Sequence, residues 1–288
     1  MTVALNLASS IALLACVYGL INVGFVLLFR TTGVPSFAQG HLAMLGGLVM
    51  FSAQRWLGGY VLPAVATVAV AAVAGWLLYP ALMRFVLGAE EFTKAMVTFM
   101  LAIIVLQAAT LGWGTGSHAI AQPIHARIQV GGTNVSVMLL VTICVLLALV
   151  ALLYVVLDKT TTGVRMQALA ENETLSMYAG IRVHRLSAVA WASAFALAAV
   201  AGILYSQKAD INLLTADVGL AAFPAAVIGG LSSIPGALVG GLLLAATQGT
   251  VNYFVGGSYG LLVVYAATLL VLIARPQGLM GTVAGQRI

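Results

Sequence analysis

The sequence contains few charged side chains: Lys and Arg number twelve and Asp and Glu seven, 7% of 288 residues. In soluble domains roughly a quarter of the residues are charged. With 62% hydrophobic residues and a mean hydropathy of +1.11, the chain is predicted to be an integral membrane protein. Because one crossing needs about 20 apolar residues, there is room for about eight to ten spans. We therefore expect one transmembrane domain, residues 1–288, and no soluble domain of normal size.

The sequence also lacks the groups that power transport. None of its three lysines follows a glycine, so it has no Gly-Lys-Ser/Thr signature of an ATP-binding loop. All Asp, Glu, Lys and Arg residues fall in or next to predicted loops, and we place only His41 among the ionisable groups inside a span. Ion-coupled carriers and membrane-embedded enzymes need such groups at membrane depth. We expect no enzymatic activity, and an energy source on another chain.

Metal ligands and cofactor motifs are equally scarce. Cys16 and Cys144 both lie inside apolar runs, where cysteine is typical as a small core residue. His118 and His125 share a loop, but they are seven residues apart with no Cys, Asp or Glu nearby, which is poor ligand spacing. We expect neither a metal site nor a cofactor.

Nine apolar runs are present, and backbone amides in hydrocarbon need partners within their own segment, so these runs are predicted to be helices. The fold class is an all-α multi-span bundle. The run at 218–231 is short and carries Pro224, Gly229 and Gly230, so it is either a crossing or a re-entrant helix; we take it as a crossing. The runs are 7–29, 37–54, 60–86, 92–111, 136–157, 184–206, 218–231, 236–254 and 258–274.

Counting Lys and Arg on the two sides of these runs predicts the orientation, because basic residues collect in cytoplasmic loops. The N-terminus is predicted outside and the C-terminus in the cytoplasm. Three basic residues fall on the outer side: Arg55, Arg127 and Lys208. Nine fall on the inner side: Arg30, Arg84, Lys94, Lys159, Arg165, Arg182, Arg185, Arg275 and Arg287.

The predicted cytoplasmic loop at about 158–185 is a hydrophilic island with seven charged residues. It is predicted to form a helix from Gly163 to Gly180. At about 100° per residue, one face of that helix is mostly apolar and carries one carboxylate. Such a face either docks into a partner's groove or lies on lipid headgroups. Its residues are Val164, Ala168, Glu171, Leu175 and Tyr178.

Within this loop, Ala170-Glu171 is followed nine residues later by Gly180-Ile181. The segment resembles the coupling loop of ABC importer permeases, and more narrowly that of the LivH-type permease of branched-chain amino acid transporters. The stretches at 18–24, 36–40, 227–241 and 275–279 are also similar to that family. The Gly-rich Val227-Ile-Gly-Gly-Leu-Ser-Ser-Ile-Pro-Gly-Ala-Leu-Val-Gly-Gly241 is the most specific of them.

The resemblance implies a permease subunit that forms half of a translocation path in a bacterial inner membrane. It implies four kinds of contact: a second homologous permease subunit, two ATP-binding subunits, an extracytoplasmic solute-binding protein, and membrane lipid, with no nucleic acid. Ala170, Glu171, Gly180 and Ile181 then couple the permease to the ATPase. Pairing with a different permease rather than an identical one follows from the resemblance alone.

Polar residues inside spans are candidates for the solute path, since each is costly unless it is hydrogen-bonded or faces water. They are Asn22, Gln39, His41, Gln107, Gln248 and Asn252, of which all but Gln107 are assigned to the path. Gly236 and Gly240 form a GxxxG motif, which lets helices approach closely, either within the chain or at a subunit interface.

The solute itself stays open. Where many relatives carry Asn-Phe-Ala-His-Gly, this chain has Ser36-Phe-Ala-Gln39-Gly40. Branched-chain or related small amino acids are expected from the resemblance, and urea, amides or other small polar solutes are alternatives. A self-sufficient channel for a neutral solute is a further alternative, although it gives no reason for a docking helix.

Overall fold

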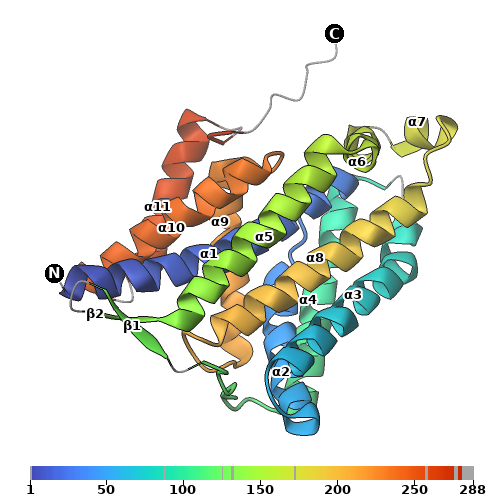
Figure 1. The fold of residues 1–288 in the computed structure, drawn as a ribbon. Coiled ribbons are helices and arrows are strands. Elements are labelled where there is room, and N and C mark those ends of the chain that lie inside the picture. The colour runs from blue at the N-terminus through green and yellow to red at the C-terminus, as the bar shows by residue number, and fades with distance from the viewer. Residues whose placement is uncertain are drawn as a thin grey trace.

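The computed structural model describes residues 2–86, 89–124, 126–130, 133–171, 173–256, 259–275 and 278–280. These residues form a helical bundle with one short β-hairpin (Figure 1). The first half contains α1 Thr2–Thr32, α2 Gln39–Leu57, α3 Val61–Leu82, the 3₁₀ turn η1 Met83–Val86, α4 Glu91–Trp113, β1 Arg127–Val130 and β2 Thr133–Ser136. The second half contains α5 Val137–Lys159, α6 Thr161–Glu171, α7 Glu173–Tyr178, α8 Val183–Tyr205, η2 Leu213–Ala216, α9 Asp217–Gly229, α10 Ile234–Phe254 and α11 Tyr259–Ala274.

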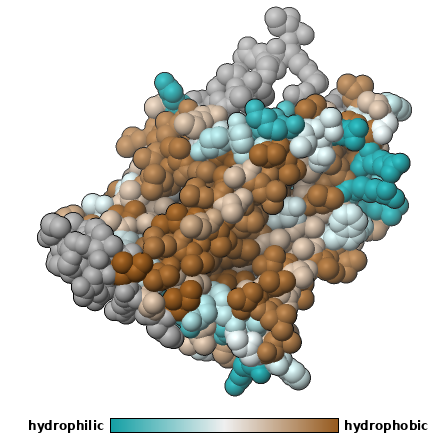
Figure 2. All heavy atoms as spheres, viewed as in Figure 1, coloured by the Kyte–Doolittle hydropathy of each residue, from teal (hydrophilic) through white to brown (hydrophobic). Residues whose placement is uncertain are grey.

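Six of the described helices are long and apolar enough to cross a membrane, which confirms the predicted multi-span helical protein. Their burial separates a centre from a periphery. In α1, 83% of the most apolar window is buried, and in α8 67%, whereas the figure is 17% in α3 and α5. Apolar side chains accordingly cover much of the visible surface in Figure 2, between hydrophilic groups that gather towards the ends. The bundle is therefore built around α1 and α8, and its outer helices present apolar surface to lipid.

Glycine lets the central helices approach closely. A Cβ on Gly202 of α8 would lie 1.8 Å from the Ala43 carbonyl oxygen of α2, and one on Gly46 would lie 2.4 Å from the Cα of Ala199. Such spacing is far inside van der Waals contact, so these positions admit no side chain. Close backbone approach of this kind is the usual way that membrane helices pack without a hydrophobic driving force.

Residues 211–232 join the two ends of the bundle, but the run predicted as a crossing at 218–231 covers only the second part of that distance. α9 has 13 residues and is about 20 Å long, which is shorter than the hydrocarbon core of about 30 Å. Ile211 pairs through backbone hydrogen bonds with His118, just beyond α4, and Ser232 at the other end meets Arg30 of α1. Residues 206–216 therefore cover the first part of the distance, with η2 as their only helical turn.

α2 also begins part-way along the bundle. A Cβ on Gly24, eight residues before the end of α1, would lie 2.0 Å from Nε2 of Gln39, the first residue of α2. Gly40 in turn packs against the backbone of Ala216 and Gly219, where α9 starts. The starts of α2 and α9 thus meet beside the last third of α1, and helices that begin within the bundle are typical of transporters.

Candidate functional site

The hydrophilic island folds as two helices rather than one. α6 ends at Glu171 and α7 begins at Glu173, while Asn172 lies outside the described residues. Figure 1 draws the two helices with different directions at one end of the bundle, next to the ends of α5 and α8. The expected single helix from Gly163 to Gly180 is corrected in this respect.

One side of these helices is fixed to the bundle. Met166 and Leu169 are each 2% exposed, and α6 contacts α1, α5 and α8. A Cβ on Gly163 would overlap the Leu157 carbonyl oxygen of α5, so only glycine allows this approach. The start of α6 is therefore held tightly against the end of α5.

The opposite side carries apolar side chains on the surface. Val164 is 65% exposed, Leu175 63%, Met177 45% and Tyr178 85%. Three of them belong to the predicted apolar face, and its fourth apolar member, Ala168, is half-buried. The side chains of Ala170 and Glu171 lie outside the described residues. We call Val164, Leu175, Met177 and Tyr178 the α6–α7 surface.

Gly180 ends α7. Its φ of 79° is in the left-handed region, its N–H donates to the Met177 carbonyl oxygen, and the Ile181 N–H donates to that of Ser176. These two bonds form a Schellman motif, which satisfies the last carbonyl groups of a helix. The Gly-Ile pair therefore stops α7 and redirects the chain into α8.

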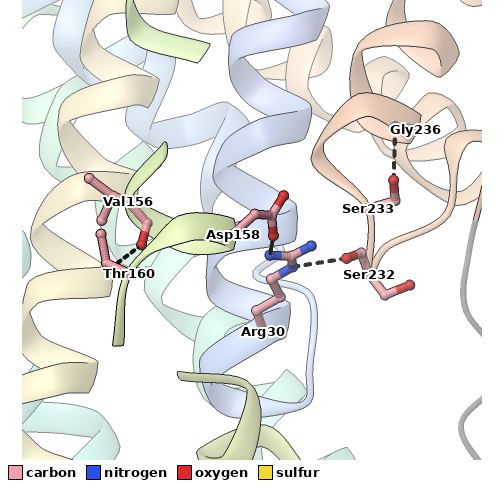
Figure 3. Close-up of polar contacts among 7 residues, drawn as sticks. All are labelled: Arg30, Val156, Asp158, Thr160, Ser232, Ser233 and Gly236. Carbon is pink, nitrogen blue, oxygen red and sulfur yellow. Dashed lines mark hydrogen bonds and ion pairs between the residues drawn. The ribbon is translucent and has the colours of Figure 1, made fainter. Parts of the chain in front are cut away.

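Arg30, in the last turn of α1, joins three segments at this end of the bundle (Figure 3). Its Nη1 donates to Oδ1 of Asp158 in α5 at 2.9 Å, and its Nε donates to the Ser232 carbonyl oxygen, between α9 and α10, at 2.8 Å. The side chains of Arg30 and Asp158 are 11% and 24% exposed. From the sequence, Arg30 was expected only as a basic residue on the cytoplasmic side.

The residues assigned to the solute path do not form one cluster. Asn22 is fully buried and donates from Nδ2 to the Ala237 carbonyl oxygen of α10 at 3.1 Å. Gln39 is fully buried on the α8 side and donates from Nε2 to the Ala194 carbonyl oxygen at 3.0 Å. Asn22 Oδ1 and Gln39 Oε1 are both buried without a hydrogen-bond partner. Each amide is thus half-satisfied, on a different side of α1.

The other three candidates differ in their surroundings. His41 has a buried Nδ1 without a hydrogen-bond partner, and Gln248 accepts a 2.6 Å bond from the Tyr18 hydroxyl group. Asn252 packs against Gly260 of α11, and its Oδ1 is also buried without a hydrogen-bond partner. Gln107, the polar candidate not assigned to the path, is exposed on α4.

Trp191 is a residue that the sequence analysis missed. It is 1% exposed on α8, one turn before Ala194, and its Nε1 is buried without a hydrogen-bond partner. A tryptophan in an apolar run looks like ordinary core, so no local pattern singles it out. Its ring packs beside Tyr79 of α3 and Phe195 of α8.

Gly236 and Gly240 lie where α10 contacts α9. A Cβ on Gly236 would meet the Gly229 carbonyl oxygen at 2.2 Å, and one on Gly240 would meet that of Ala225 at 2.0 Å. Both glycines therefore serve contact within the chain.

No group of three or more metal-ligating side chains occurs in the part of the chain that the structure describes. His118 is placed 3.1 Å from the Trp113 carbonyl oxygen through Nε2, and His125 lies outside the described residues.

The family of permease components of branched-chain amino acid transport systems matches residues 7–272. The chain belongs to this family. A probable branched-chain amino acid transport permease LivH from Methanocaldococcus jannaschii is 29% identical, over 91% of this chain and 88% of that protein. LivH of Escherichia coli K12 is 27% identical over 93% and 92%, and BraD of Pseudomonas aeruginosa 27% over 92% and 91%.

Among solved structures, a chain of PsaBC from Streptococcus pneumoniae in complex with Fab shares the fold. Its TM-score is 0.51, with 12% identity, 94% of this chain covered and 92% of that chain. The permease family and the apolar helices make this chain a multi-pass membrane permease. The suspected LivH-type resemblance is thereby confirmed.

Proposed function

We propose that this chain is the membrane subunit of an ABC importer for branched-chain or related small amino acids, in a bacterial plasma membrane. The α6–α7 surface is the contact for an ATP-binding subunit. It couples ATP-driven movement to the spans through α5 and α8, and the subunit catalyses no reaction itself. Ala170 and Glu171 act at the junction of α6 and α7, and Gly180 with Ile181 sets where α7 ends.

The exposed apolar side chains of α6 and α7 carry this proposal. They sit in the most highly charged stretch of the chain, where lipid tails do not reach, and large exposed apolar groups of this kind mark binding surfaces. Their helices are anchored on the other side by buried Met166 and Leu169. Helices that expose apolar side chains to a partner and are anchored to the bundle on their other side can transmit a movement of that partner to the spans.

The orientation follows from charge. The segment that carries the α6–α7 surface also carries Lys159, Arg165, Arg182 and Arg185, and Arg30 lies beside it. With basic residues retained in the cytoplasm, this end is cytoplasmic, the N-terminus is outside and the C-terminus is inside. A solute-binding protein then meets the opposite end, and a second permease subunit completes the path.

The solute passes near α1, where polar groups occur between apolar helices. Asn22, Gln39, His41, Gln248 and Asn252 are assigned to this path, on both sides of α1. Branched-chain amino acids are favoured over urea and amides because the relatives are named for them. Identifying the solute that copurifies with the solute-binding protein would show directly which substrate is transported.

The test replaces Tyr178 with Glu in the full transporter and measures how much ATP-binding subunit copurifies. We expect its loss, because a buried carboxylate without a partner is costly. Tyr178→Phe is the matched control and retains the subunit. Normal copurification with Tyr178→Glu contradicts the proposed contact. Solute uptake by this chain alone in liposomes favours the self-sufficient channel instead.

A further inference from the structure

Arg30 connects segments that are far apart in sequence. Asp158 is 128 residues away and Ser232 is 202 residues away, yet both lie within 3 Å of its guanidinium group. Arg30–Asp158 is an ion pair between two helix ends in the described part of the chain. The planar guanidinium group holds its two acceptors in a fixed geometry, as an ammonium group does not. The contact therefore sets the relative position of α1, α5 and the α9–α10 turn.

Asp158 is closely linked to α6. It precedes the last residue of α5, and only Lys159 and Thr160 separate it from Thr161, where α6 begins. The Thr160 hydroxyl group donates to the Val156 carbonyl oxygen, and Gly163 packs against the Leu157 carbonyl oxygen. Because the connection between Asp158 and α6 is this short, a displacement of α6 also moves Asp158.

Ser232 is linked just as closely to α9 and α10. The neighbouring Ser233 hydroxyl oxygen accepts a 3.1 Å hydrogen bond from the Gly236 N–H and caps α10, as Figure 3 shows. Gly229 and Gly236 bring the two helices together below the turn. A displacement of Ser232 therefore moves both helices, including the start of α9 that packs on Gly40 of α2.

The position of Asp158 is not explained by helix stability. A carboxylate in the last turn of a helix lies beside the negative end of its dipole, which is unfavourable, whereas Arg30 in the last turn of α1 is favourably placed. Exposed ion pairs contribute little to stability, but this one is mostly shielded and charge-assisted at both bonds. The burial and the two hydrogen bonds therefore fit a contact that connects helices better than they fit an ordinary surface ion pair.

We propose that Arg30 is a positioning residue that transmits movement of α6 and α7 to the α9–α10 turn during transport. The inference rests on the proposed function, since it needs an ATP-binding subunit to move α6 and α7. In this inference, Arg30 at the end of α1 relays movement from that subunit to the starts of α2 and α9, near Gln39 and Gly40. Loss of the contact leaves the ATP-binding subunit bound while its work no longer reaches the solute path.

The experiment uses the complete transporter in proteoliposomes with leucine-loaded binding protein, and measures ATP hydrolysed per leucine taken up. The variants are Arg30→Gln and Asp158→Asn. We expect each to copurify with the ATP-binding subunit, to keep ATP hydrolysis within about twofold, and to raise the ratio about tenfold, a typical size for coupling between sites. The double variant Arg30→Asp with Asp158→Arg restores part of the coupling.

Two controls separate this contact from general charge effects. Lys159→Gln changes an exposed charge next to Asp158, and Arg84→Gln removes an exposed arginine at the same end of the bundle. Both keep the parent ratio. If Arg30→Gln does not insert into the membrane, the ratio measured for Asp158→Asn is the test. Asparagine has nearly the shape of aspartate and, being neutral, costs less to bury.

An unchanged ratio in both variants overturns the inference, as does a fall in membrane yield with the ratio unchanged, which marks a purely structural contact. If Tyr178→Glu releases the ATP-binding subunit while Asp158→Asn transports normally, the proposed function stands and this inference alone fails. If Tyr178→Glu also leaves the complex intact, the proposed contact itself has failed.

Discussion

The α6–α7 surface and the polar interior around α1 depart from ordinary burial in opposite ways. On α7, Tyr178 is 85% exposed although it is largely apolar. Beside α1, Asn22 and Gln39 are fully buried although each leaves an oxygen without a partner. Both arrangements are costly for an isolated chain. Under the proposed function, an ATP-binding subunit covers the surface, and a solute or water meets the interior groups.

The surface and the interior are therefore tested by different measurements. We expect variants of the surface to change assembly with the ATP-binding subunit. We expect variants of the interior to change uptake in a complex that still assembles. The following predictions test that division, beginning with the largest expected effect.

Two neighbours on α6 separate anchoring from docking. Met166→Ala removes a side chain that is 2% exposed, and we expect it to destabilise the folded protein by about 2–5 kcal/mol. Val164→Ala removes one that is 65% exposed and changes stability by less than about 0.5 kcal/mol. Thermal unfolding in detergent measures both. If the two variants lose the same free energy of unfolding, α6 does not have one buried and one exposed side.

Glu171→Arg tests the family-derived coupling role. We expect uptake to fall about a hundredfold, or about 2.7 kcal/mol, because a reversed charge in a docked contact is repelled by its partner groups. Membrane yield stays unchanged, since α6 keeps its helix-forming sequence. Transport assays and immunoblots of the membrane fraction measure the two quantities. Normal uptake by this variant removes Glu171 from the coupling contact.

Gln39→Leu tests the interior. We expect stability to be kept or slightly raised, since the change removes an orphaned oxygen, while uptake falls about tenfold with the ATP-binding subunit still bound. Gln248→Leu is the contrasting variant. It removes the acceptor of the Tyr18 hydroxyl group and is expected to destabilise the protein by about 1–3 kcal/mol. Unchanged uptake with Gln39→Leu takes that residue off the path.

Each of the nine predicted apolar runs contains a helix in the structure, because an apolar run must form a helix in hydrocarbon, but only six of these helices are long and apolar enough to cross a membrane. The sequence predicted the run at 218–231 but not its non-helical approach, since residues 206–212 show neither a long apolar run nor a helical period. It assigned Val164, Leu175 and Tyr178 to an apolar face, and each of these side chains is exposed. It did not predict the division of that helix into α6 and α7.

Contacts between distant segments could not be predicted in the same way. Arg30 reads locally as a basic residue after a span, and its partners lie 128 and 202 residues away. Trp191 reads as core, and only the fold shows that its Nε1 lacks a partner. Gly40 and Gly219 look like common membrane glycines until α2 and α9 are seen to meet at them. These features depend on tertiary packing, which leaves no periodic signal.

Gly180→Ala has the smallest expected effect and tests how the end of α7 holds the α6–α7 surface. The φ of Gly180 is 79°, and a Cβ there meets no atom within 4 Å, so the cost is backbone strain alone, about 1 kcal/mol. We expect the last turn of α7 to fray, which loosens Tyr178, while Met166 and Leu169 keep α6 in place. Affinity for the ATP-binding subunit then falls about fivefold, and stability of the bundle hardly changes. Amide hydrogen exchange at Ala179 and Gly180 measures the fraying. A loss of affinity without faster exchange means that Gly180 contacts the partner directly and does not act only as the stop of α7.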